Sequence, residues 1–155
     1  MSIIESTRFP STDLPITDVL VVDDEDSIRN LLSIAIRRAG LSCDTASDGL
    51  VALDRLRTAC YSVVLTDLMM PRLDGIGLVQ RLIVREPLVN CRPILLVMTA
   101  FSTSAALALI ADFVQVVIPK PFLLAEVVAL IHKCVKLRSP SETESPFETR
   151  SSDPC

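Results

Sequence analysis

The pattern that most constrains the fold repeats five times along the chain: a short apolar run, then a segment whose apolar residues recur at helical spacing. The first run, 18–22, is β-branched and does not alternate with polar residues, which indicates a strand buried on both faces. In the following segment the apolar residues recur every three or four positions up to Gly40, a helix stop signal. The other expected strands are 41–46, 61–66, 93–99 and 113–118. The second expected helix begins near Ser47 or Asp48, and the third includes 78–83. The last two expected helices span 102–110 and 122–137.

Five successive strand–helix units predict an α/β fold, a doubly wound five-stranded parallel sheet with helices on both faces. The 155 residues suit one such domain, which we expect to span 17–138. Residues 1–16 are rich in Ser, Thr and Pro and predict a flexible arm. Residues 139–155 form an acidic Ser/Pro-rich segment with too few apolar residues to offset the entropy of ordering, so we expect a disordered tail.

Composition excludes several classes of function. A net charge of −4 argues against a nucleic-acid-coating surface or attraction to anionic membranes, and 4% aromatic residues argue against a stacking platform for single strands. No signal peptide and no bilayer-length apolar run are present, which predicts a soluble, cytoplasmic protein. The cysteines include no CxxC pair, and we expect reduced thiols at all five: Cys43, Cys60, Cys91, Cys134 and Cys155.

Polar residues with potential chemistry follow the ends of four expected strands. Asp23 and Asp24 come after the first, Asp67 after the third, Thr99 closes the fourth, and Lys120 follows the fifth. In a parallel sheet the carboxyl ends of the strands share one edge, so these side chains are expected to converge there. Three adjacent carboxylates need a divalent cation or a lysine to stay ionised together, and oxygen ligands with few carboxylates suit Mg²⁺.

Each of these residues also has a purely structural interpretation. Asp23 and Asp24 could cap the first helix, and Asp67 could begin a turn. Thr99 could be an ordinary strand residue and Lys120 a surface charge. Capping explains one carboxylate but not a hydroxyl and an ammonium at the same edge, so the joint placement favours a functional site.

Four stretches, VLVVDDE (19–25), VVLTDLMMPRLDG (63–75), VMTA (97–100) and IPKPF (118–122), resemble the signatures of the response-regulator receiver domain of two-component signalling. The resemblance covers about 18–137. It implies a flavodoxin-like sheet of strand order 2-1-3-4-5 with five helices, and a cis peptide at the KP pair, 120–121.

The resemblance also implies the roles of the site residues. Asp67 would accept a phosphoryl group from a sensor histidine kinase or a phosphotransfer protein. Lys120 would pair with the acyl phosphate, and Thr99 would move to hold it and reshape the face formed by the fourth helix, fifth strand and fifth helix. Mg²⁺ would be bound by Asp24, Asp67 and the backbone carbonyl of Met69, with Asp23 acting through water.

Three positions depart from the family or modify its chemistry. Val117 replaces the aromatic residue that usually precedes the strand-five lysine by three positions, which puts the threonine–aromatic coupling in doubt. Met69 and Phe101 flank the acceptor with apolar groups that cannot orient a water, so we expect slow autodephosphorylation. His132 lies in the last expected helix, away from the acid residues, and is interpreted as a structural or surface histidine and not as a phosphorelay histidine.

The apolar fourth and fifth helices allow two interpretations. In the first interpretation, these helices pack deeply within one molecule. In the second, they form a face that pairs with a second receiver or a partner protein. We expect a stand-alone switch rather than an enzyme, with no direct nucleic-acid or membrane partner. A degenerate receiver acting as a constitutive scaffold is the alternative, favoured only by Val117. A Mg²⁺ phosphohydrolase is disfavoured because Met69 stands where such enzymes carry a second aspartate.

Overall fold

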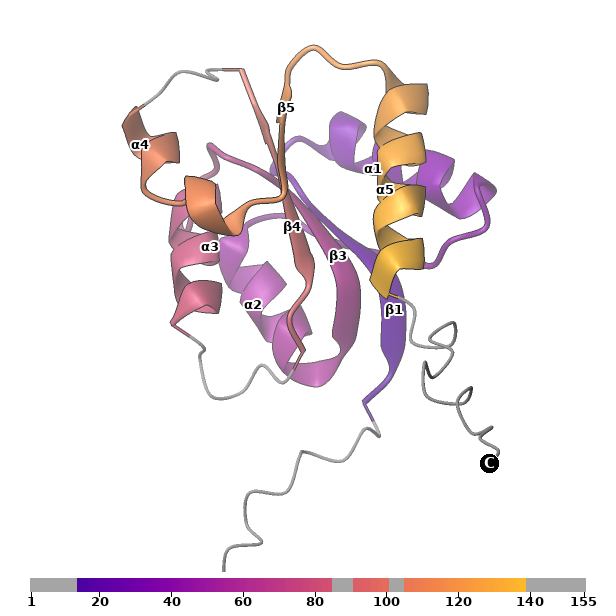
Figure 1. Cartoon of the computed structure of the whole chain (residues 1–155), viewed down its shortest axis with the longest axis horizontal. Coiled ribbons are helices and arrows are strands. Elements are labelled where there is room, and N and C mark those ends of the chain that lie inside the picture. Colours follow the sequence, from indigo (N-terminus) through magenta and orange to yellow (C-terminus); the bar gives the residue numbers. More distant parts are fainter. Residues whose placement is uncertain (1–13, 85–90, 101–104, 139–155) are drawn as a thin grey trace, which may run out of the picture.

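The computed structural model describes residues 14–84, 91–100 and 105–138. It contains a five-stranded, all-parallel sheet of order β2-β1-β3-β4-β5, as the sequence predicts (Figure 1). The strands are β1 (Ile16–Val22), β2 (Cys43–Ala46), β3 (Cys60–Asp67), β4 (Ile94–Thr99) and β5 (Val116–Pro119). The helices are α1 (Asp26–Arg38), α2 (Gly49–Thr58), α3 (Gly75–Ile83), α4 (Ala105–Ala108) and α5 (Leu124–Arg138), with a 3₁₀ turn, η2, at Ala111–Phe113.

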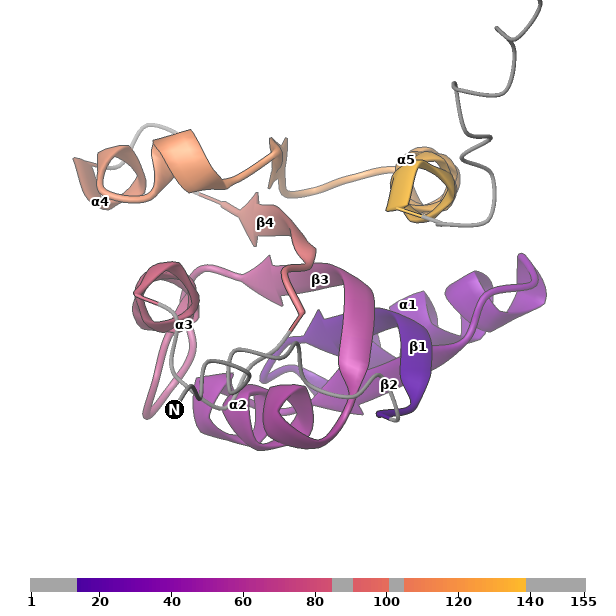
Figure 2. The ribbon, with the colours of Figure 1, turned by 60° about the horizontal axis from the view of Figure 1, so that its bottom comes forward.

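Helices α2 and α3 lie on one face of the sheet, and α1 and α5 lie on the other (Figure 2). Because successive strand residues point to opposite faces, the sheet separates two apolar cores. In β1, Val19 and Val21 pack with residues of α1 and α5, whereas Leu20 and Val22 pack with residues of α2, α3 and α4. Burial on both faces explains why the strand sequences are continuously apolar. Both cores stabilise the sheet from which the loops at its carboxyl edge project.

One expected helix ends earlier, and one expected strand begins later, than the sequence predicts. The expected helix over 102–110 ends at Ala108, the last residue of α4, and the proposed caps Ser102 and Thr103 lie outside the described residues. The expected strand 113–118 is displaced to Val116–Pro119, because Phe113 closes the 3₁₀ turn by donating its amide to the Ile110 carbonyl. The ends of the other helices and strands agree with the expected ends within about two residues, except that α3 begins earlier than expected, at Gly75.

The expectation of five reduced thiols is wrong for one pair. Cys60 and Cys91 form a disulfide with their Cα atoms 5.5 Å apart. Cys60 begins β3 and Cys91 precedes β4, and these neighbouring strands bring together two residues 31 positions apart. Cys43 and Cys134 are buried free thiols, as expected.

The apolar residues of α5 differ in how deeply they are buried. Val127, Ile131 and Cys134 are buried, while Val128 and Leu130 are half-buried. Across the described residues, every helix is too short or too polar to cross a membrane. The expected arm and tail lie almost entirely outside the described residues and stay predictions.

Candidate functional site

The three predicted carboxylates converge at the carboxyl edge of the sheet. Val22 of β1 is paired with Thr66 of β3, so the residues that follow them, Asp23 and Asp67, lie side by side. Carboxylate oxygens of Asp23, Asp24 and Asp67 all lie within 4.8 Å of one another. Asp23 is fully buried, Asp67 is 8% exposed, and Asp24 is exposed to solvent. This corner of the sheet therefore holds two carboxylates away from water and a third in contact with it.

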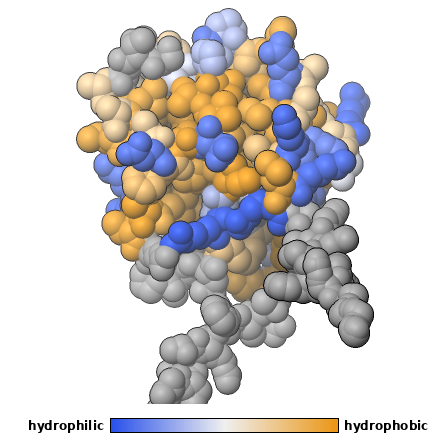
Figure 3. Space-filling view, viewed as in Figure 1, coloured by the Kyte–Doolittle hydropathy of each residue, from blue (hydrophilic) through white to orange (hydrophobic). Residues whose placement is uncertain are grey.

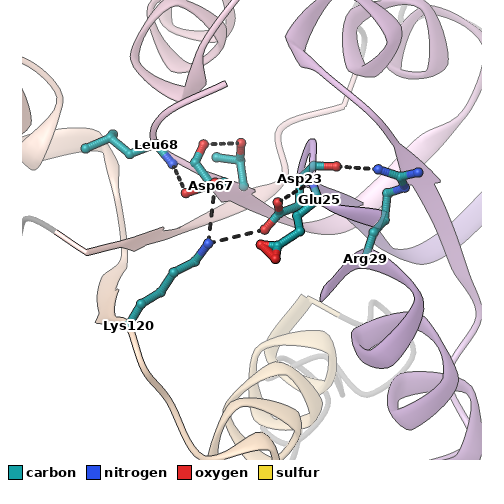
Figure 4. A network of polar contacts seen from close by, with 7 residues as sticks. Asp23, Glu25, Arg29, Asp67, Leu68 and Lys120 are labelled. Carbon is teal, nitrogen blue, oxygen red and sulfur yellow. Dashed lines mark hydrogen bonds and ion pairs between the residues drawn. The ribbon is translucent and has the colours of Figure 1, made fainter. Parts of the chain in front are cut away.

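Lys120 supplies a positive charge at this corner, and its ammonium lies between the two buried carboxylates (Figure 4). Its Nζ atom is 3.4 Å from Asp23 Oδ2 and 3.4 Å from Asp67 Oδ2. The Lys120 amide donates to the carbonyl of Thr99 at 2.8 Å, which continues the pairing of β4 with β5. The peptide bond between Lys120 and Pro121 is cis, as the resemblance implied.

Asp23 is held by two further contacts, both visible in Figure 4. The Glu25 amide donates to Asp23 Oδ1 at 2.9 Å, and Arg29 of α1 donates to the Asp23 carbonyl at 2.6 Å. Arg29 also pairs with Asp26 one turn earlier on α1. Sequence reasoning missed Arg29, although its position one turn into the helix after an acid pair is a usable signal.

Asp67 is the last residue of β3, and it is a constrained carboxylate. Its Oδ1 accepts the Leu68 amide at 2.8 Å, and its carbonyl accepts the Thr66 hydroxyl at 2.9 Å. Burial and the neighbouring Asp23 charge raise the pKa of Asp67, while Lys120 and the Leu68 amide lower it. The net direction is upward, so one lysine does not fully offset the cost of placing these carboxylates together.

The donor set suits a divalent cation. Among the described residues the cluster offers carboxylate oxygens as ligands, and one of the three carboxylates, that of Asp24, is open to solvent. A bound cation would offset the Asp23 charge that helps to raise the pKa of Asp67. A hard ion that keeps several waters fits such a site. The three aspartates of the predicted magnesium set are therefore brought together. The predicted contribution of the Met69 carbonyl is untested; the Met69 side chain is 62% exposed.

The loop between β3 and α3 is fastened at both ends. The Gly75 amide donates to the Leu68 carbonyl at 3.0 Å, and the Asp74 carboxylate caps α3 by accepting the Gly77 amide. Arg72, which has a positive φ of 67°, forms an ion pair with Asp48. Asp48 is buried and caps α2 by accepting the amides of Leu50 and Val51. Sequence reasoning missed the Arg72–Asp48 pair, because the two residues are 24 positions apart.

Four further residues singled out from the sequence remain to be located. Thr99 is buried at the end of β4 and approaches Lys120 through the backbone contact described above. Val117 is half-buried against the core beneath α2, α3 and α4 and pairs with Val97. His132 lies on α5 and is half-buried, and Phe101 lies outside the described residues.

Comparisons with known proteins agree with this geometry. A model of the response regulator receiver domain matches residues 19–132. The DNA-binding transcriptional regulator NtrC of Klebsiella pneumoniae is 37% identical over 116 residues, which are 74% of this chain and 24% of that protein. Response regulator MprA of Mycobacterium sp. (strain KMS) is 33% identical over 124 residues, 80% of this chain and 53% of that protein. The chain thus spans between about a quarter and about half of the length of these relatives.

Solved structures give the same result. The Francisella response regulator 1452 receiver domain superposes with a TM-score of 0.69 at 27% identity, covering 79% of this chain and 99% of that one. Vibrio cholerae chemotaxis protein CheY4 superposes with a TM-score of 0.63 at 27% identity, covering 77% and 98%.

Proposed function

The chain belongs to the response regulator receiver domain family of two-component signalling, and we propose that it is a switch in which Asp67 accepts a phosphoryl group with the help of Mg²⁺. The donor is a sensor histidine kinase or a phosphotransfer protein, and the exchange takes place in the cytoplasm. The observation that carries the proposal is the position of Lys120, whose ammonium lies 3.4 Å from both Asp23 and Asp67 at the open edge of the sheet.

The proposed reaction uses the Asp67 carboxylate as the nucleophile. One of its oxygens forms the new P–O bond while the phosphorus–nitrogen bond to the donor histidine breaks, and the electron pair of that bond leaves with the imidazole. The Leu68 amide on Oδ1 holds the carboxylate in one orientation, leaving Oδ2 on the side of Lys120. Lys120 neutralises charge on the transferred oxygens.

The proposed Mg²⁺ would be held by Asp24, Asp67 and the Met69 carbonyl, with Asp23 acting through water. The ion would neutralise negative charge on the transferred phosphoryl group. Arg29 and the Glu25 amide fix the orientation of Asp23 before the donor arrives. Preorganised charge of this kind lowers the barrier without reorganisation during the reaction.

The proposed output is a change in the face formed by α4, β5 and α5. Phosphorylation adds negative charge and acceptor oxygens beside buried Thr99, whose hydroxyl is drawn toward them. Apolar residues spread widely over this side of the molecule (Figure 3), and Leu109, Phe113 and Leu123 are each more than half exposed. Such a face suits a partner protein or a second copy of the chain, without direct nucleic-acid or membrane contact.

The protein is proposed to act on itself rather than to turn over a separate substrate. Met69 stands two residues after Asp67, where a phosphohydrolase would need a carboxylic acid. The alternative of a constitutive scaffold has one observation in its favour, the half-buried Val117 in place of a larger aromatic switch. The assembled acid cluster and Lys120 argue for phosphoryl chemistry instead.

Acetyl phosphate with Mg²⁺ tests the proposal. We expect the intact mass to rise by one phosphoryl group in the wild-type protein and in Asp54→Asn, a matched control at an exposed aspartate of α2. Asp67→Asn should gain none. Beryllofluoride should change the elution volume in size-exclusion chromatography if the apolar face pairs copies of the chain. A wild-type protein without adduct or beryllofluoride response would support the scaffold instead.

A further inference from the structure

The disulfide between Cys60 and Cys91 lies at the opposite end of β3 from the acid cluster. Cys60 is the first residue of this strand and Asp67 the last, so roughly 23 Å of strand separates them. Both cysteines are half-buried, which leaves the pair within reach of small molecules in solution. Their Cα separation of 5.5 Å matches the usual spacing of a disulfide.

The other two cysteines in the described part of the chain are poor competitors for oxidation. Cys43 is buried, and burial raises the pKa of its thiol to about 11 despite the nearby Arg37 charge. Burial also raises the pKa of the Cys134 thiol. Because the thiolate is the reactive form, neither residue reacts readily near neutral pH. Oxidation within this part of the chain is therefore directed to Cys60 and Cys91.

The sheet does not need the bond to keep its arrangement. Strands β3 and β4 are paired from Val63 with Ile94 to Asp67 with Met98, and apolar cores cover both faces of these strands. The strand residues that follow each cysteine are thus held by backbone pairing and packing. Removing the bond releases a covalent constraint while the acid cluster at the far edge keeps its contacts.

From these observations we propose that Cys60 and Cys91 form a reversible oxidation site, a redox input to the stability of the domain that is separate from phosphorylation. The oxidant is a small-molecule disulfide such as glutathione disulfide. One cysteine thiolate attacks it to form a mixed disulfide and releases one glutathione. The second cysteine thiolate attacks the protein sulfur of that mixed disulfide and releases another. The two cysteines lose two electrons and two protons, and one glutathione disulfide is reduced to two glutathiones.

The consequence follows from the segment that the bond encloses. Residues 60–91 contain the acceptor strand, Asp67 and α3, so the closed bridge restricts the unfolded chain around the functional edge. A ring of this size favours the folded state, in the chain-entropy account of disulfides. The oxidised domain is therefore more resistant to unfolding, while the distant site works at the same rate.

The test compares two samples of the full-length protein, one treated with a reducing phosphine and the other treated with glutathione disulfide. Peptide mapping with an alkylating reagent should find Cys60 and Cys91 protected only in the oxidised sample, and the melting temperature should be higher by roughly 10 °C. Cys60→Ser and Cys91→Ser should each remove the dependence of the melting temperature on redox state. Neither readout requires phosphorylation, so failure here is distinguishable from failure of the proposed switch.

Alkylation of both cysteines after oxidation, or one melting temperature in the two states, would overturn the proposal. If the serine variants fold poorly, a second measurement uses the wild-type protein alone. It is oxidised, reduced and oxidised again, and its melting temperature should follow each change. The rate of adduct formation from acetyl phosphate should agree within about twofold between the two states, since roughly 23 Å separates the bridge from Asp67. A larger difference would contradict the separation of the two inputs.

Discussion

Gly75, at the start of α3, lies so close to Asp67, the proposed acceptor, that a Cβ atom on Gly75 would stand 2.3 Å from the backbone carbonyl oxygen of Asp67. The same Cβ would stand 2.9 Å from the Cα of Leu68. Both contacts are with backbone, which cannot rotate away as a side chain can. The absence of a Cβ at Gly75 therefore allows the loop to pack closely against the end of β3. The position of Asp67 depends on this close packing.

We predict that Gly75→Ala displaces the loop and lowers the free energy of unfolding by about 1–3 kcal/mol, the usual cost of forcing extra atoms into a packed site. Chemical denaturation measures this loss, and the rate of adduct formation from acetyl phosphate should fall as well. Gly40→Ala is the matched control. Gly40 has a φ of +90°, but a Cβ there would meet no atom within 4 Å, so its substitution should cost stability and leave the rate unchanged. Equal rates for Gly75→Ala and wild type would contradict the prediction.

The second prediction concerns Asp48, which joins the start of α2 to the loop after the acceptor. Burial alone would raise the pKa of Asp48, but hydrogen bonds from the Val51 and Leu50 amides and from Arg72 hold the net pKa below the ordinary value of 3.8. A carboxylate with a lowered folded-state pKa contributes stability above pH 3.8, and that contribution is lost as the pH falls through the folded value.

Asp48→Asn keeps a capping oxygen but removes the charge that pairs with Arg72. We expect a loss of about 0.5–1 kcal/mol at pH 7, because Arg72 is largely exposed and its ion pair is screened. The difference between variant and wild type should shrink as the pH falls below 3.8. Urea titrations at several pH values measure it, and a difference independent of pH would rule out the charge as its cause. In Arg72→Ala, the further loss caused by Asp48→Asn should be smaller.

Some features of the fold and the site could be predicted because local sequence patterns determine them. Continuous apolar runs mark strands buried on both faces, and the parallel topology then places Asp23, Asp67 and Lys120 at one edge. In the structure, the Lys120 ammonium lies 3.4 Å from the Asp67 carboxylate. The strand order itself follows from the family resemblance rather than from periodicity.

Other features depend on contacts that no local pattern reports. Phe113 belongs to an apolar run that reads as strand, yet it closes a 3₁₀ turn because its amide bonds to Ile110. The Cys60–Cys91 bond and the Asp48–Arg72 pair join residues 31 and 24 positions apart, which meet only once the strands and helices are packed. Apolar character alone does not distinguish a short turn from a strand.

The third prediction concerns the effect of magnesium on stability. Because Asp23 and Asp67 are buried beside one another, a divalent cation bound there relieves their repulsion and favours the folded state. At a concentration about ten times its dissociation constant, Mg²⁺ should add about 1.4 kcal/mol to the free energy of unfolding. Denaturation with and without Mg²⁺ measures this gain.

Asp23→Asn should reduce the gain from Mg²⁺, and Asp54→Asn, far from the cluster, should not. Without the ion, Asp67→Asn should be at least as stable as wild type, because the variant removes one of the two negative charges that repel each other. A gain from Mg²⁺ that survives in both Asp23→Asn and Asp67→Asn would place the ion elsewhere.

The last prediction concerns the lifetime of the phosphorylated state, which we expect to be long. The side chain at position 69, two residues after the acceptor, is an apolar methionine that is 62% exposed, so it offers water no hydrogen-bonding partner at the acyl phosphate. Met69→Gln introduces such a partner. It should speed loss of the phosphoryl group roughly tenfold, which corresponds to about 1.4 kcal/mol of barrier. Met69→Leu keeps an apolar side chain of similar size and should leave the rate unchanged. Since the methionine is exposed, both variants should melt close to wild type. Decay of the adduct followed by intact mass gives the rates, and equal decay of Met69→Gln and Met69→Leu would show that this position does not control access of water.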